Sequence, residues 1–163
     1  MRSDFTCLLG SFSKEALESY PGAIYGLWPD LTIAWANRAY FRFAAENSGE
    51  PKISSHWAVG ASVIHGIRGE QSAFYRKAFK ACIESGQKWE HTYENSSAER
   101  YRFCRMLVRP LGNGEGLLVV NSTIRDSLHN PKIRPSFTAS AAYKDRRGFV
   151  HQCCECRRVQ NHE

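Results

Sequence analysis

The residues with the clearest chemical capacity lie near the C-terminus, where His151 is followed by Cys153 and Cys156. Two thiolates at this spacing can bind one tetrahedral metal ion, and a nearby imidazole can supply a further ligand. A single Cys-x-x-Cys pair is a weak signal, because complete zinc sites usually show a second pair. The pattern predicts a metal site at Cys153, Cys156 and His151, with zinc as the candidate ion.

A redox function is the competing interpretation of the same thiols. Arg157 and Arg158 follow directly, and neighbouring positive charge favours the thiolate, which is the form that oxidants attack. A third interpretation is an exposed chain end with no site, since termini are often poorly ordered. No secretory signal is expected at the N-terminus, so a disulfide framework is not expected either.

A second set of residues could line a cavity for a small molecule. They fall on a predicted helix, 70–85, and on two predicted strands, 100–108 and 116–124. Asn121 is the most informative, because an amide within an apolar strand needs a partner if it points inward. In the competing interpretation, the rings fill the core and Asn121 faces solvent. Aromatic residues at helical spacing more often have this packing role. The candidate lining residues are Tyr75, Phe79, Cys104, Met106 and Asn121.

The elements that would position these residues follow from the periodicity of the chain. Strands are predicted for 23–28 and 32–35, on either side of the turn pair Pro29-Asp30. Asn37 is a good N-cap for a helix over 38–47, and Gly86 stands where the helix over 70–85 should end. The other predicted elements are a short helix over 14–20, capped by Ser13, and strands over 89–93, 100–108 and 116–124.

The order of strand, turn, strand and Asn-capped helix resembles the opening of a PAS domain. The resemblance implies an α+β fold, a five-stranded antiparallel sheet with helices covering one face. It divides the chain into an N-terminal extension (1–12), a PAS-like sensory domain (13–124) and a basic, cysteine-containing tail (125–163). The motifs that carry it are Pro21-Gly22-Ala23-Ile24, Trp28-Pro29-Asp30, Asn37-Arg38-Ala39-Tyr40 and the closing strand over 116–123.

The tail carries a narrower resemblance. The segment Cys153-x-x-Cys156-Arg157-Arg158-Val159 resembles a Cys-x-x-Cys-basic-basic-aliphatic signature that follows the PAS domain in some bacterial signalling proteins. Together the two resemblances imply a bacterial sensory module that binds a small ligand or a protein partner and signals by contact. They also imply a homodimer, with contacts through the N-terminal helix and the exposed sheet face. The alternative function is a metal or thiol-redox sensor that acts through the C-terminal cysteines.

The same resemblance also allows a haem cofactor, because some PAS domains bind haem through a histidine. His65, before the long helix, and His91, in the third predicted strand, are the candidates for an axial ligand. A lone histidine is more often a surface or hydrogen-bonded residue than a metal ligand. The cofactor expectation is therefore a small organic ligand or haem, without a choice between them.

Composition and charge narrow the remaining classes of function. No apolar run approaches the ~20 residues of a membrane span, and we expect a cytoplasmic protein. Residues 1–124 carry 14 Lys and Arg against 12 Asp and Glu, whereas residues 125–163 carry 8 against 4. A basic tail can bind nucleic acid, but charged segments are more often simply solvated, so nucleic acid is not the expected partner. No phosphate-binding loop or catalytic triad stands out, and we do not expect an enzyme.

Overall fold

The computed structural model describes residues 4–46, 57–67, 70–97, 99–128 and 146, and the account below concerns these residues. The candidate metal or redox residues Cys153, Cys156 and His151 lie outside them. None of the described helices is both long enough and apolar enough to cross a membrane.

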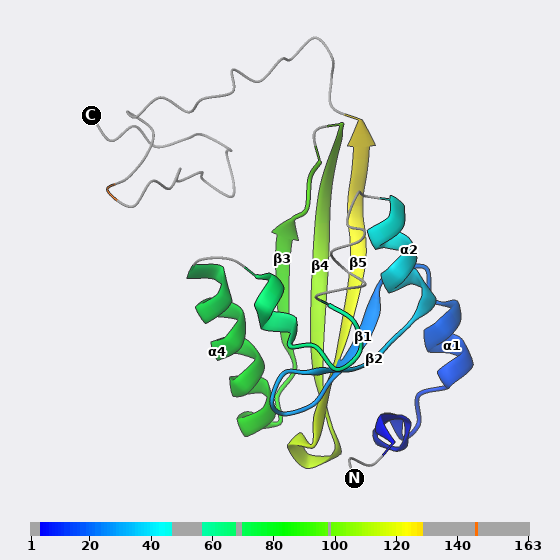
Figure 1. Cartoon of the computed structure of the whole chain (residues 1–163), viewed down its shortest axis with the longest axis vertical. Helices are drawn as coiled ribbons and strands as arrows, with labels where there is room; N and C mark the ends of the chain where they lie inside the picture. Colours follow the sequence, from blue (N-terminus) through cyan, green and yellow to red (C-terminus); the bar gives the residue numbers. More distant parts are fainter. Residues whose placement is uncertain (1–3, 47–56, 68–69, 98, 129–145, 147–163) are drawn as a thin grey trace. The chain divides into compact units, whose positions relative to one another are not determined.

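Five antiparallel strands form one sheet in the order β2-β1-β5-β4-β3 (Figure 1). The expected five-stranded antiparallel sheet is therefore confirmed. The two longest strands extend beyond their predicted ends and pair from Arg100 opposite Leu128 to Leu111 opposite Gly116, with a shift of register between Phe103 and Cys104. The strand bounds are Ile24–Leu27 for β1, Ile33–Ala36 for β2, Trp89–Glu94 for β3, Arg100–Leu111 for β4 and Gly116–Leu128 for β5.

The helices begin and end where local signals place them. Ser13 caps α1, since its hydroxyl accepts a hydrogen bond from the Ala16 amide at 3.2 Å. Gly86 follows α4 with a φ of +67°, the left-handed conformation expected of a glycine after a helix. The described residues also form three short 3-10 helices: η1 and η2 were not predicted, and η3 (Gly112–Gly114) forms the predicted reversal between β4 and β5. The bounds are Phe5–Leu9 for η1, Lys14–Ser19 for α1, Arg38–Glu46 for α2, Val63–Gly66 for η2 and Glu70–Ser85 for α4.

The two faces of the sheet carry separate apolar clusters, because successive residues of a strand point to opposite faces. Leu117 and Val119 of β5 belong to an inner cluster that contacts α4, η2 and α2. Leu118 lies between them in sequence and belongs to an outer cluster with Phe5 and Leu17. Helices thus cover the inner face, as expected, and η1 and α1 pack in addition on part of the outer face (Figure 1).

Asn37 connects the first half of the fold. Its side chain is fully buried, and its Oδ1 accepts hydrogen bonds from the amides of Tyr40 and Ile24, both at 3.0 Å. Its Nδ2 donates to the carbonyls of Leu17 at 3.1 Å and Gly22 at 3.0 Å. The predicted N-cap is confirmed by the Tyr40 bond. The other three bonds tie α1, the α1–β1 loop and β1 to the start of α2.

Candidate functional site

A cavity of about 590 Å³ lies between the inner face of the sheet and the elements that cover it. This volume is within the usual range of small-molecule sites, ~300–1,000 Å³. All five residues predicted from the sequence to line a pocket are in its wall: Tyr75, Phe79, Cys104, Met106 and Asn121. The sheet forms the floor of the cavity, and α2, the 57–67 segment and α4 form its other walls.

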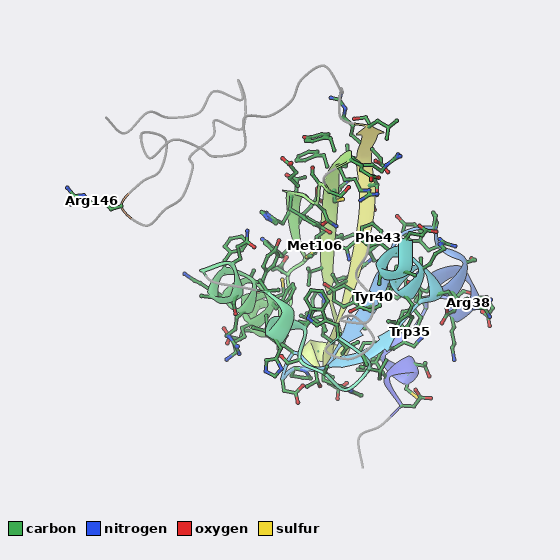
Figure 2. The ribbon with its side chains drawn as sticks, turned by 45° about the horizontal axis from the view of Figure 1, so that its top comes forward. Trp35, Arg38, Tyr40, Phe43, Met106 and Arg146 are labelled. Carbon is green, nitrogen blue, oxygen red and sulfur yellow. The ribbon has the colours of Figure 1, made fainter. Side chains whose placement is uncertain are left out.

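Aromatic side chains make up much of the wall. Figure 2 shows Tyr40 and Phe43 of α2 turned toward the region of Met106, whereas Arg38 of the same helix points away. The Tyr25 and Tyr40 rings meet edge to face, with centroids 5.6 Å apart. Flat apolar walls of this kind favour ligands that contain rings. The aromatic residues of the described wall are Tyr25, Tyr40, Phe43, Trp57, Tyr75, Phe79 and Tyr93.

A polar pair sits on the floor of the cavity. The Tyr93 hydroxyl of β3 donates a hydrogen bond to Asn121 Oδ1 of β5 at 3.0 Å. Asn121 Nδ2 donates in turn to the carbonyl of Ala23 at 3.3 Å. The Asn121 amide therefore has partners within the fold and is part of the cavity wall, instead of facing solvent.

The ionisable groups on the floor are neutral at pH 7. Burial raises the pKa of Tyr25, and the nearby phenols of Tyr93, Tyr40 and Tyr75 raise it further. Burial also raises the pKa of the Tyr93 hydroxyl and of the Cys104 thiol. Each of these groups therefore keeps its proton and can both donate and accept hydrogen bonds.

The charged side chains of the described wall lie at its solvent-exposed rim. They are Arg42 and Glu46 of α2 and Glu94 of β3, and all three residues are exposed. The Arg42 guanidinium donates a hydrogen bond to the carbonyl of Pro21 at 3.3 Å. The electrostatic character of the cavity thus changes from neutral on the floor to charged at the rim.

Neither candidate haem ligand lines the described part of the cavity. His65 is exposed. His91 is half-buried and stacks between Trp89 and Tyr93, with ring centroids 5.3 and 6.4 Å away, and burial lowers its pKa. The described wall therefore offers no histidine to a haem iron. Among the described residues there is also no cluster of three side chains suited to hold a metal ion.

Several wall residues were not predicted from the sequence. Tyr40 and Phe43 share the buried side of α2, three residues apart, and this spacing could have identified them. Trp57 carried no such signal, because it belongs to no periodic stretch of the sequence. Its ring packs against Gly66, where a Cβ atom would overlap it, and its carbonyl accepts a hydrogen bond from the Tyr40 hydroxyl at 3.1 Å.

Comparisons with known proteins identify the fold. No protein-family model matches the chain, and no curated protein matches it. The PAS domain of BvgS from Bordetella pertussis is similar, with a TM-score of 0.54 and 12% identity, over 69% of this chain and 83% of that chain. The VqmA dimer of Vibrio cholerae gives a TM-score of 0.52 and 13% identity, over 68% of this chain and 49% of that chain. At such low identity the similarity shows the fold alone, and that fold is PAS-like.

Proposed function

We propose that this chain is a PAS-type sensory module that binds a small organic molecule in the cavity and signals by contact with a protein partner. The observation that carries the proposal is the cavity of about 590 Å³, with aromatic walls and the Tyr93–Asn121 pair on its floor. Pockets that combine apolar walls with a few convergent polar groups are typical of ligand-binding sites. The module is non-catalytic in this proposal.

The composition of the cavity wall suggests how a bound ligand would change the surface that a partner contacts. α2 and α4 contribute to different sides of the cavity, and both pack on the same sheet. A ligand that contacts both helices favours the arrangement in which both contacts are made, and it shifts the population toward that arrangement. In the proposal, a homodimer of a bacterial, cytoplasmic protein presents the resulting surface to its signalling partner.

Native mass spectrometry of the full chain, purified without added ligand, tests this proposal. We expect a mass excess that matches a small organic molecule and that disappears on denaturation. Cys104→Phe should abolish the excess, because the larger side chain would enter the cavity from β4. Cys7→Phe is the matched control at an exposed position and should keep it.

The competing metal- or redox-based function gives a different result in the same experiment. A mass excess of one zinc ion that survives Cys104→Phe and is lost when Cys153 and Cys156 are replaced by serine would favour a sensor in the tail. A bare protein mass, together with unchanged stability on addition of any small molecule tried, would argue against a ligand sensor.

A further inference from the structure

The residues on the floor of the cavity are neutral and come from four strands. Tyr25 lies on β1, Tyr93 on β3, Cys104 on β4 and Asn121 on β5. The structure describes every residue of these four strands. The part of a ligand that rests on the sheet therefore meets phenol, thiol and amide groups, with no carboxylate or ammonium among them.

The hydrogen bonds on the floor leave a specific set of groups for a ligand. The Tyr93 hydroxyl uses its only hydrogen in the bond to Asn121 Oδ1 at 3.0 Å, so its oxygen can only accept from a ligand. The Asn121 amide has two hydrogens, and one of them is used on the Ala23 carbonyl at 3.3 Å. The Asn121 amide also interacts with the Tyr25 hydroxyl, and this interaction lowers the pKa of Tyr25 against the effect of burial. The floor thus presents the accepting oxygen of Tyr93 next to the donor groups of Asn121 and Tyr25.

Among the described residues, no charged side chain lies on the floor of the cavity to compensate a ligand charge there. Arg102 lies on the same face of β4 but is not part of the described cavity wall. Its guanidinium packs over the Phe43 ring and pairs at 3.4 Å with Asp126, which also pairs with Arg100 at 2.8 Å. Two of the three charged rim residues, Glu46 and Glu94, are acidic and would repel an anion at the entrance. A carboxylate or an ammonium on the floor would lose its water without gaining a partner of opposite charge.

We infer that the cavity selects an uncharged, ring-containing molecule whose polar group both donates and accepts hydrogen bonds, as a primary amide or a hydroxyl does. This inference rests on the proposed function and adds the chemical class of the ligand. The Tyr93–Asn121 pair, together with the Tyr25 hydroxyl beside it, is the specificity determinant: the ligand donates to the Tyr93 oxygen and accepts from the Asn121 amide or from the Tyr25 hydroxyl.

The test compares molecules of the same shape that differ in charge. Indole-3-acetamide, benzamide and nicotinamide are each paired with the corresponding carboxylate, and binding to the full chain is measured at pH 7 by ligand-observed NMR and calorimetry. We expect at least one amide to bind, and to bind at least tenfold more tightly than its carboxylate. Tyr93→Phe should weaken amide binding about fivefold or more, because it removes the hydrogen-bonding oxygen and keeps the ring.

Tyr101→Phe is the matched control, since Tyr101 is not part of the cavity wall, and it should leave amide binding unchanged. Tighter binding of the carboxylates would overturn the inference and leave the proposed ligand sensor intact. Equal loss of amide binding in the Tyr93 and Tyr101 variants would overturn the assignment of the Tyr93–Asn121 pair. If none of the three amides bound, the inference on the ligand class would be contradicted, whereas the proposed function would still be decided by the mass excess in native mass spectrometry.

Discussion

At the scale of single residues, Asn37 shows how much one buried amide can organise. A helix N-cap alone contributes about 1 kcal/mol. Asn37 also pairs the amide of Ile24 and the carbonyls of Leu17 and Gly22, all at a position with no exposed side-chain surface. Those groups cannot turn to water if the amide is removed, so the cost should exceed that of a lost cap.

The first prediction concerns Asn37→Ala. We expect the free energy of unfolding to fall by about 2–4 kcal/mol, because each buried polar group left without a partner costs roughly 1–3 kcal/mol. Urea denaturation of the full chain measures this value. A loss of about 1 kcal/mol would mean that Asn37 acts only as a cap.

Asn37→Asp separates donation from acceptance at the same position. The carboxylate keeps the acceptor for Tyr40 and loses the donor to the Leu17 and Gly22 carbonyls. The Tyr40 and Ile24 amides that donate to this position lower the pKa of the new carboxyl, but we expect full burial and the two facing carbonyls to outweigh them, so that its pKa in the folded state lies above its unfolded value. The stability of this variant relative to Asn37→Ala should therefore decrease as pH rises from about 4 to 7. A flat difference between the two variants over that range would contradict the buried geometry.

At the scale of elements, the N-terminal η1 behaves as part of the outer cluster. The Phe5 side chain is only 3% exposed, and its ring meets Trp28 edge to face with centroids 5.2 Å apart. Gly26 of β1 provides the space for this ring, since a Cβ atom there would overlap it. Phe5 and Leu9 thus pack together with residues of the predicted PAS-like domain (13–124), although the sequence analysis places them in an N-terminal extension.

This packing predicts a double-mutant cycle. Phe5→Ala should lower the free energy of unfolding by about 2–4 kcal/mol, near the range for buried Phe→Ala changes, whereas Cys7→Ala on the exposed side of η1 should cost less than about 0.5 kcal/mol. Gly26→Ala should destabilise the wild type through the clash with Phe5. In the Phe5→Ala background the clash is gone, so Gly26→Ala should cost little. Additive costs in the cycle would show that the two residues do not meet.

The elements also show where sequence reasoning succeeds and where it stops. α4 was predicted over 70–85 because a long apolar stripe and Gly86 mark its course, and β3 and the start of β4 followed from alternation. η1 has five residues and too little length for a periodic signal. In the site, Tyr75 and Phe79 could be assigned to the inner side of α4 from spacing alone. Tyr25 and Trp57 could not, because their places in the wall depend on strand pairing and on the Gly66 contact.

At the scale of the whole molecule, β5 joins the two clusters. It lies between β1 and β4 in the sheet, with Leu117 and Val119 buried on the inner face and Leu118 on the outer face. Because both clusters contain residues of β5, unfolding of this strand disrupts both clusters at the same time. The cavity on one face and η1 and α1 on the other should therefore unfold together, and a ligand in the cavity should stabilise both faces by the same free energy.

The last prediction tests this coupling with Leu118→Ala, a change in the outer cluster at a residue that is not part of the cavity wall. It should lower the free energy of unfolding by about 2–4 kcal/mol, and unfolding followed by tryptophan fluorescence and by far-ultraviolet circular dichroism should still coincide in one transition. The fluorescence reports on both faces, since Trp28 and Trp35 pack against the outer cluster and Trp57 and Trp89 against the inner one. Leu107→Ala, at a half-buried position of β4, is the matched control and should cost about 1 kcal/mol, because less apolar surface is lost. Two separate transitions in Leu118→Ala would mean that the outer cluster melts alone, and stabilisation by a ligand would then be confined to the inner face.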